Sequence, residues 1–283
     1  VGGYAAGPVC LAAALLGVPL AVFEPNGAPG LANRLVGPFA RRAYLAWPEA
    51  SRPFRRAAIR LHGVPLRAGF TARPYTPNEV ARVLVMGGSQ GAAALDERLP
   101  EAMARLGDAG RRVEVTHQAG RGRETAVRDD YARRRVAGVT VVPFIDDVAA
   151  AVSGADLVVA RAGASTIAEV TAIGRASGLV PFPHAADDHQ ARNAEALASR
   201  GAAVCLLQRD ADAVRLATEI GALLRDDRKR TAMADASRAC GRPEAAREVA
   251  IDLLGLASVP LRAAAARGVG GGRGVRSDVR RCA

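Results

Sequence analysis

Three turns rich in glycine or polar residues each follow a short apolar run, and their residue types suit the binding of phosphates and sugars. The first is Gly87-Gly88-Ser89-Gln90-Gly91, between the apolar run at 82–86 and an Ala-rich segment of helical composition. Glycine allows close backbone approach, and the first N–H groups of a helix bind anions. The Ser89 hydroxyl can also donate to a phosphate oxygen. The turn is not the GxGxxG dinucleotide pattern, so by itself it fits a merely tight strand-to-helix turn equally well.

The second turn is Arg161-Ala162-Gly163-Ala164-Ser165-Thr166, which follows the apolar run at 156–160. Glu169 comes one helical turn further on. Parallel α/β sheets bind ligands at the carboxyl ends of their strands, so the first two turns are expected to face one crevice. The paired oxygens of Glu169 suit the two hydroxyls of a ribose. The alternative is that Glu169 is a first-turn carboxylate favoured by the helix dipole.

The third polar segment, residues 181–193, lies between a predicted strand and a predicted helix. Gln190 and Asn193 are about one helical turn apart and can hydrogen-bond sugar hydroxyls without an ionised group. Asp187 or Asp188 as a helix cap is the alternative account of part of this segment. The same aspartates, taken with the two histidines of the segment, fit no standard set of metal ligands, so no metal site is predicted.

The chain from residue 80 onward alternates short β-branched runs with Ala-rich segments of helical period, which predicts a parallel sheet with crossover helices. The predicted strands are residues 82–86, 112–117, 139–143, 156–160, 178–182 and 203–207. The predicted helices are residues 92–106, 122–135, 146–153, 165–173, 188–200, 211–224, 229–236 and 243–256. Each of the three turns therefore follows a strand and precedes a helix.

The first part of the chain also has an α/β pattern, with predicted helices at 5–16 and 31–40 and predicted strands at 20–23 and 43–47. Residues 67–78 contain a glycine and two prolines without an apolar period, which indicates a linker. We therefore expect a first domain with its linker at residues 1–77 and a second domain with closing helices at residues 78–261. Residues 262–283 are rich in Arg, Ala and Gly, which predicts a disordered basic tail.

Composition narrows the functional classes. With 283 residues, of which 49% are hydrophobic, the chain is long enough for two packed domains. Its net charge is +11, and the tail carries six Arg against one Asp. Because no aromatic side chains are interleaved with the basic ones, no nucleic-acid partner is predicted. The four cysteines lack CxxC spacing, and the apolar run at 8–23 is interrupted by Gly17 and Pro19, so neither a zinc site nor a membrane-spanning helix is predicted.

Together these motifs resemble the MurG family of bacterial lipid I N-acetylglucosaminyltransferases (undecaprenyldiphospho-muramoylpentapeptide β-N-acetylglucosaminyltransferases). The resemblance covers residues 1 to about 257. In chain order its motifs are Gly2-Gly3-Tyr4 with Gly7-Pro8, Glu24 with Asn26, Pro29-Gly30-Leu31 with Asn33-Arg34, Gly63 with Pro65 and Arg67, GGSQGA at 87–92, PFIDD at 143–147, RAGAST at 161–166 with Glu169, and PHAADDHQ at 183–190 with Asn193. The chain departs from the family pattern at Phe23, Pro25 and Val64, on the acceptor side.

The resemblance implies an α/β fold of the GT-B type, with two Rossmann-like domains built on parallel sheets and the first of them incomplete. It implies UDP-N-acetylglucosamine as donor, held mainly by the second domain, and no cofactor. The motif positions imply that the Ile145 backbone contacts uracil, that Ser89, Ala164, Ser165 and Thr166 bind the diphosphate, that Glu169 binds the ribose and that Gln190 binds sugar hydroxyls. They also imply that Arg67 brings charge to the donor phosphates, that Asn26 lies on the acceptor side, and that Gly2, Gly3 and Tyr4 cradle the acceptor diphosphate. On the residues alone, Arg67 equally fits a solvated linker position and Gly2-Gly3-Tyr4 a helix-entry turn.

The implied reaction transfers N-acetylglucosamine to lipid I and forms lipid II in peptidoglycan synthesis. A polyprenyl acceptor implies peripheral docking on the cytoplasmic face of the cell membrane, for which Arg41, Arg42, Arg55 and Arg56 are candidate contacts or else solvated surface. The family's general base belongs to a glycine-rich loop that would precede Val1, so we expect the chain to be a piece of a longer protein and assign no catalytic residue. The alternatives are a non-catalytic UDP-sugar-binding fragment and another GT-B enzyme, such as a sugar-nucleotide epimerase.

Overall fold

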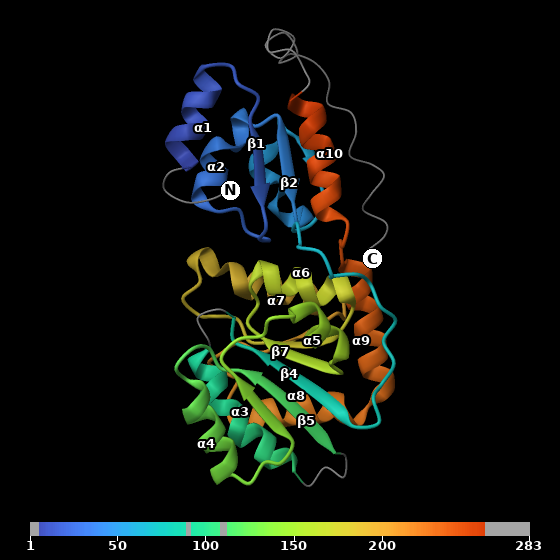
Figure 1. The fold of residues 1–283 in the computed structure, drawn as a ribbon. Helices are drawn as coiled ribbons and strands as arrows, with labels where there is room; N and C mark the ends of the chain where they lie inside the picture. Colours follow the sequence, from blue (N-terminus) through green and yellow to red (C-terminus); the bar gives the residue numbers. More distant parts are fainter. Residues whose placement is uncertain (1–5, 89–91, 108–111, 258–283) are drawn as a thin grey trace. The chain divides into compact units, whose positions relative to one another are not determined.

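The computed structural model describes residues 6–88, 92–107 and 112–257. The chain forms two compact units (Figure 1). The first unit comprises residues 1–67, 186–189 and 242–283, and the second comprises residues 68–185 and 190–241. Gly2, Gly3, Tyr4, Ser89 and the basic tail lie outside the described residues, so the expectations for them are untested.

The second unit is built on a six-stranded, entirely parallel sheet with the strand order β6-β5-β4-β7-β8-β9. Its strands are β4 (Ala81–Met86), β5 (Val113–Gln118), β6 (Val139–Val142), β7 (Leu157–Ala160), β8 (Ala176–Leu179) and β9 (Val204–Cys205). Its helices are α3 (Ala93–Leu106), α4 (Glu124–Arg133), α5 (Val148–Gly154), α6 (Ala164–Ile173), α7 (His189–Ala198), α8 (Ala213–Arg225) and α9 (Asp227–Cys240). The 3-10 turn η3 (Ala186–Asp188), just before α7, groups with the first unit. The predicted α/β fold with a parallel sheet is confirmed.

Helices cover both faces of this sheet. Helices α3, α4 and α8 lie on one face, and α5, α6 and α9 lie on the other (Figure 1). On the first face, alternate residues of β4 such as Val83 and Val85 pack with Leu99 of α3 and Ile220 of α8. Strands with helices on both faces must be apolar throughout, which explains why β7 is buried at every position.

Strand β8 differs most from its predicted range, because it spans Ala176–Leu179 instead of 178–182. Pro181 has no backbone N–H and cannot donate to the ladder, so the chain leaves the sheet before it. The residues from Val180 onward therefore belong to the segment that follows the strand, where polar groups can reach a ligand.

The segment predicted as a linker is attached to the second unit. Tyr75 is buried, and its hydroxyl donates a 2.7 Å hydrogen bond to Oδ1 of Asp156. The Asn78 side chain donates to Oδ2 of the same carboxylate, at 2.9 Å. Arg230, which is fully buried, donates from Nε to the Tyr75 hydroxyl at 3.0 Å. Residues 67–78 were predicted as a linker because two isolated buried aromatic residues, Phe70 and Tyr75, produce no periodic signal.

The first unit contains a three-stranded parallel sheet of order β1-β2-β3. Its elements are α1 (Ala6–Leu15), β1 (Ala21–Glu24), α2 (Leu31–Val36), the 3-10 turn η1 (Gly37–Phe39), β2 (Arg42–Leu45), the 3-10 segment η2 (Pro48–Phe54), β3 (Ala58–Arg60) and α10 (Ala245–Ala257). Strand β3 was not predicted, because three residues without alternation give no strand signal. The predicted helix at 31–40 is a short α-helix followed by a 3-10 turn at Pro38.

Helix α10 groups with the first unit, although sequence reasoning placed it among the closing helices of the second domain. Asp252 of α10 accepts hydrogen bonds from Tyr44 and Arg42 of β2 and from Arg60 of β3. The compact units therefore divide the chain differently from the expected boundary after residue 77. An amphipathic pattern predicts that α10 is a helix but does not specify the sheet on which it packs.

Candidate functional site

The carboxyl ends of five neighbouring strands form one row in the second unit. In the sheet register, Val142 of β6 pairs with Gln118 of β5, Gln118 pairs with Met86 of β4, Met86 pairs with Ala160 of β7, and Ala160 pairs with Leu179 of β8. Each of these residues is the last of its strand. Adjacent strands are about 4.8 Å apart, so the row from β6 to β8 spans roughly 19 Å. The turns after these strands therefore start side by side along one edge of the sheet.

The turn after β7 leads directly into α6, and the first two turns of this helix carry four of the predicted donor-binding residues. Gly163 is the N-cap, and no side chain caps the helix. The backbone N–H groups of Ala164, Ser165 and Thr166 precede the first intrahelical donor, Ile167, whose N–H bonds to Gly163. Free N–H groups at the start of a helix attract anions. Glu169 lies one turn further along α6 and is half-buried.

The polar segment after β8 places Gln190 near this turn along the same edge. The backbone N–H of Phe182 donates to Oε1 of Gln190 at 3.0 Å. Asn193, expected as a second sugar contact, is fully buried, and its Nδ2 lies 3.5 Å from the carbonyl oxygen of Ala162. Asn193 therefore supports the turn after β7 from within, whereas Gln190 keeps partial exposure.

Arg161 is a further residue of this edge to which sequence reasoning gave no role. Its Nη1 donates to the carbonyl oxygens of Val180 at 3.1 Å and Pro181 at 3.3 Å, and its guanidinium lies 5.5 Å from the centre of the Phe182 ring. Burial lowers the pKa of Arg161, and the nearby charge of Arg98 acts in the same direction. The sequence feature that could have indicated a role for Arg161 is its position directly after a buried strand, where a long cationic side chain is unusual.

The turn after β5 rests on a buried polar network that sequence reasoning also missed. His117 is fully buried, and its ring nitrogens lie 3.1 Å from Oδ1 of Asp96 and 3.0 Å from the Tyr131 hydroxyl. Arg123, in the segment after β5, lies 3.0 Å from Oδ2 of Asp96. Burial and the charge of Asp96 raise the pKa of Tyr131. The network joins α3, β5 and α4, and it makes His117 a structural residue.

The turn after β6 contains Ile145, predicted to offer its backbone to uracil. The Ile145 side chain is buried, and Asp147 caps α5 by accepting a 2.8 Å hydrogen bond from the N–H of Ala150. Phe144, next to Ile145, is 47% exposed. A fixed backbone beside an exposed aromatic ring is suited to a flat base.

In the first unit, Asn26 belongs to a loop organised by the buried carboxylate of Glu24. Oε1 of Glu24 accepts from the backbone and side-chain nitrogens of Asn26, at 3.1 and 3.3 Å. Its Oε2 accepts from the N–H of Gly30 at 3.0 Å and from Nδ2 of Asn33 at 2.9 Å. Glu24 therefore holds the loop in shape. Arg67 is exposed and is the last residue of the first stretch of chain in the same unit.

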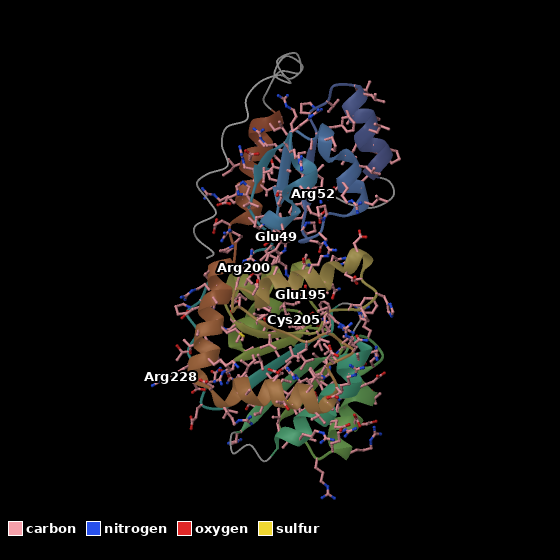
Figure 2. All side chains as sticks on the ribbon, turned by 180° about the vertical axis from the view of Figure 1, so that it is seen from behind. Glu49, Arg52, Glu195, Arg200, Cys205 and Arg228 are labelled. Atoms are coloured by element: carbon pink, nitrogen blue, oxygen red, sulfur yellow. The ribbon has the colours of Figure 1, made fainter. Side chains whose placement is uncertain are left out.

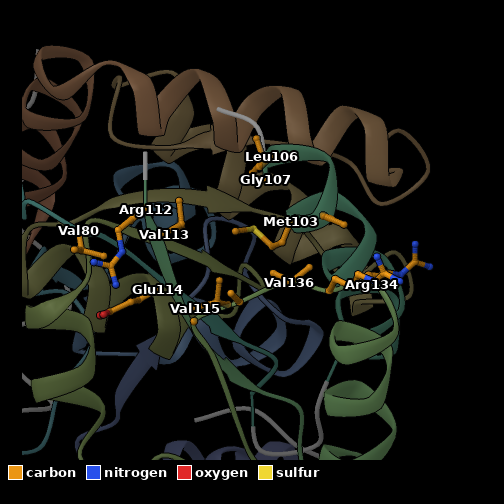
Figure 3. A pocket seen from close by; sticks show the side chains of 14 residues that line it. Val80, Met103, Leu106, Gly107, Arg112, Val113, Glu114, Val115, Arg134 and Val136 are labelled. Atoms are coloured by element: carbon orange, nitrogen blue, oxygen red, sulfur yellow. The ribbon is translucent and has the colours of Figure 1, made fainter. Parts of the chain in front are cut away.

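Other features of the second unit include a cavity and a half-buried cysteine at the carboxyl end of β9. A cavity of about 480 Å³ lies at the opposite end of the sheet, where Val80, Arg112 and Gly138 precede the strands (Figure 3). Cys205 lies near Glu195 (Figure 2), and burial together with that negative charge raises the pKa of its thiol, which disfavours a nucleophilic thiolate. Within residues 6–88, 92–107 and 112–257, no cluster of three or more His, Cys, Asp or Glu side chains is arranged to hold a metal ion.

These features define an α/β protein of the GT-B type, in which the turns at the carboxyl end of a parallel sheet start along one edge. Residues 82–249 match the glycosyltransferase family 28 C-terminal domain, and residues 1–45 match the corresponding N-terminal domain. The chain belongs to glycosyltransferase family 28.

A relative from Sorangium cellulosum, described as a UDP-N-acetylglucosamine--N-acetylmuramyl-(pentapeptide) pyrophosphoryl-undecaprenol N-acetylglucosamine transferase, is 53% identical over 279 residues. The alignment covers 98% of this chain and 69% of the relative. A protein of the same description from Anaeromyxobacter sp. strain K is 45% identical, over 88% of this chain and 66% of its own length. The chain therefore spans about two thirds of these relatives.

Solved structures agree with this assignment. The crystal structure of Acinetobacter baumannii MurG is 34% identical, with a TM-score of 0.79 over 90% of this chain and 71% of that one. A Listeria monocytogenes protein described as a putative UDP-N-acetylglucosamine 2-epimerase shares the fold alone, at 14% identity and a TM-score of 0.62.

Proposed function

We propose that this chain transfers N-acetylglucosamine from UDP-N-acetylglucosamine to lipid I, and so forms lipid II. The observation that carries the proposal is the 53% identity to a transferase of that description, which extends over nearly the whole chain. The row of strand ends supports it, because the motif residues of the second unit follow those strands. The epimerase alternative has only a shared fold in its favour.

The donor diphosphate would bind at the start of α6, to the N–H groups of Ala164, Ser165 and Thr166. Departure of UDP leaves negative charge on the diphosphate, and oriented N–H groups at a helix start stabilise such charge without reorganising. Ser89 and Arg67 would add to this stabilisation by their places in the motifs. Glu169 would accept hydrogen bonds from the two ribose hydroxyls, and the Ile145 backbone would fix the uracil.

The acceptor hydroxyl must lose a proton to attack the anomeric carbon, and we assign this step to no described residue. His117 is buried in its network with Asp96, and His62 lies 2.7 Å from Glu248. Asn26, in the loop held by Glu24, and the segment Gly2-Gly3-Tyr4 would contact the acceptor, as the motifs imply.

Peripheral docking on the cytoplasmic face of the cell membrane belongs to the same proposal, because lipid I carries a polyprenyl chain. Apolar side chains of α2 and η1 are exposed, with Leu31 at 62%, Leu35 at 65% and Phe39 at 55%. Arg55 and Arg56, which follow η2, are exposed as well, and η2 packs against α2. Apolar side chains near basic ones suit an anionic bilayer surface.

Two of the four predicted lipid-facing arginines are less suitable for this role. The guanidinium of Arg42 is bound to Asp252 at 3.0 Å, and Arg41 has one buried nitrogen. All helices within the described ranges are too short or too polar to traverse a bilayer.

An assay of N-acetylglucosamine incorporation into lipid tests the reaction. We expect incorporation that requires both lipid I and UDP-N-acetylglucosamine, with release of UDP. Binding of UDP-N-acetylglucosamine without incorporation would favour the binding-fragment alternative, and conversion of the donor to an epimer without any lipid would favour the epimerase.

Co-sedimentation with liposomes tests the membrane contact separately. We expect binding to vesicles that contain anionic lipid, reduced by the double substitution Leu35→Gln and Phe39→Gln. Equal binding to anionic and zwitterionic vesicles would contradict the proposed contact.

A further inference from the structure

Arg161 lies between the end of a central strand and the polar segment that contains Gln190, the residue predicted to bind the sugar. It follows β7 directly, and its Nη1 is shared between the carbonyl oxygens of Val180 and Pro181 in the segment after β8. A guanidinium is planar and can bond two acceptors while its face contacts an aromatic ring. Its position 5.5 Å from the Phe182 ring centre fits such a contact. One side chain thus holds three consecutive residues, 180–182.

The next link is the hydrogen bond from Phe182 to Gln190. The Phe182 N–H is a donor, so the amide atom of Gln190 that meets it at 3.0 Å must be the oxygen. The amide nitrogen of Gln190 then carries its two N–H groups on the other branch of the side chain. Gln190 therefore presents donors to a ligand, and a sugar hydroxyl would meet it as an acceptor.

We propose that Arg161 is a positioning residue for sugar recognition, which fixes the backbone at 180–182 and, through Phe182, sets the orientation of the Gln190 amide. The inference rests on the proposed function, because it requires that Gln190 contacts the sugar of UDP-N-acetylglucosamine. Arg161 then governs the affinity for the sugar and leaves the affinity for the nucleotide unchanged.

Arg98 offers a matched control. It is also half-buried, and its Nη1 also bonds two backbone carbonyl oxygens, those of Gln208 at 2.6 Å and Ala211 at 3.1 Å. These carbonyls lie outside the segment 180–190. A lysine in place of either arginine keeps the positive charge but loses the planar, two-acceptor geometry.

Isothermal titration calorimetry of the full chain with UDP and with UDP-N-acetylglucosamine tests the proposal. For Arg161→Lys we expect the Kd of UDP-N-acetylglucosamine to rise about tenfold, as for loss of one or two hydrogen bonds, and the Kd of UDP to change less than about twofold. For Arg98→Lys we expect both Kd values to change by the same factor. Thermal unfolding of each variant shows whether it is folded.

A double-mutant cycle shows whether Arg161 acts through Gln190. Gln190→Met removes the amide, so Arg161→Lys should weaken sugar binding little further in that background. Additive losses would overturn the inference, as would an equal loss of UDP and UDP-N-acetylglucosamine affinity in Arg161→Lys, which would assign Arg161 to the nucleotide. Unchanged affinities for both ligands would also overturn it. Failure of the unaltered chain to bind UDP would instead contradict the proposed function on which the inference rests.

Discussion

Tyr44 donates a 2.8 Å hydrogen bond to Oδ2 of Asp252, a residue 208 positions later in the chain. Arg42 and Arg60 reach the same carboxylate, at 3.0 and 3.3 Å. This one side chain therefore joins α10 to β2 and β3 of the first sheet. Because three donors converge on it, the contribution of Asp252 can be tested by removing its charge alone.

Asp252→Asn should lower the free energy of unfolding of the chain by about 1–2 kcal/mol, because a hydrogen-bonded charge is lost while the shape is kept. Urea unfolding at neutral pH measures the change. Asp235→Asn is the control, since Asp235 forms an exposed pair with Arg238 within α9. A loss no larger for Asp252→Asn than for Asp235→Asn would contradict the role given to Asp252.

Protonation of Asp252 at acid pH should remove the stabilisation that its carboxylate gives to the folded chain. Burial raises the pKa of Asp252, but the hydrogen bond from Tyr44 and the charges of Arg42 and Arg60 outweigh it and hold that pKa below its ordinary value. The stabilisation is thus complete above the ordinary carboxyl pKa of about 4 and is lost as the pH falls through the lower pKa of the folded state. Unfolding curves of the chain and of Asp252→Asn should therefore converge below about pH 4.

Ionisation of the Tyr75 hydroxyl should destabilise the folded chain at alkaline pH. Burial raises its pKa to about 12, with Asp156 acting in the same direction and Arg230 opposing it. The unfolded chain titrates this group near pH 10, so the contribution is full below that pH and declines as the pH rises towards 12. Tyr75→Phe should reduce the slope of unfolding free energy against pH between these values by up to about 1.4 kcal/mol per pH unit. An unchanged slope would show that another group causes the decline.

Alanine substitutions at Gly241 and Gly255 should change the free energy of unfolding in opposite directions. A Cβ at Gly241 would lie 2.7 Å from the carbonyl carbon of Thr171 and 3.0 Å from Cα of Ala172, so the backbone of α6 would have to move. Gly241→Ala should cost about 1–3 kcal/mol of unfolding free energy. Gly255 lies within α10, and no atom of the described residues lies within 4 Å of its Cβ position, so Gly255→Ala should stabilise the chain by about 0.5–1 kcal/mol. The two melting temperatures should move in opposite directions, and a shift in the same direction would refute the comparison.

Under the proposed function, Glu169 binds the ribose hydroxyls of the donor, so its substitution should weaken nucleotide binding. Glu169→Ala should weaken UDP binding roughly tenfold to a hundredfold, because the ribose hydroxyls would lose a charged acceptor. The variant should then bind UDP and 2′-deoxy-UDP with similar affinity, as calorimetry can show. Glu195→Gln, at an exposed residue of α7 that is labelled in Figure 2, serves as the control and should leave UDP binding unchanged. If Glu169→Ala still discriminated between the two ligands, Glu169 would not be the ribose contact.

The sequence alone determined the alternation of strands and helices after residue 80, because the change from β-branched runs to helical period is a local signal. It also determined that glycine and polar turns follow β4, β7 and β8, and it predicted Glu169 and Gln190 as site residues. Ile145 was predicted only through the resemblance to the family. The sequence could not determine which strands pair with each other or in which register. Only the tertiary structure brought the strand ends into one row, since register depends on contacts between residues far apart in the chain.

The same reason explains what was missed. His117 and Asp96 are polar residues at positions that look ordinary until β5 and α3 pack together and bury them. Arg161 gains its partners only because β8 lies next to β7. Helix α10 was predicted as a helix, but the partners of Asp252 lie on strands near the other end of the chain. Local sequence specifies the elements, whereas burial and long-range pairing decide which polar groups meet.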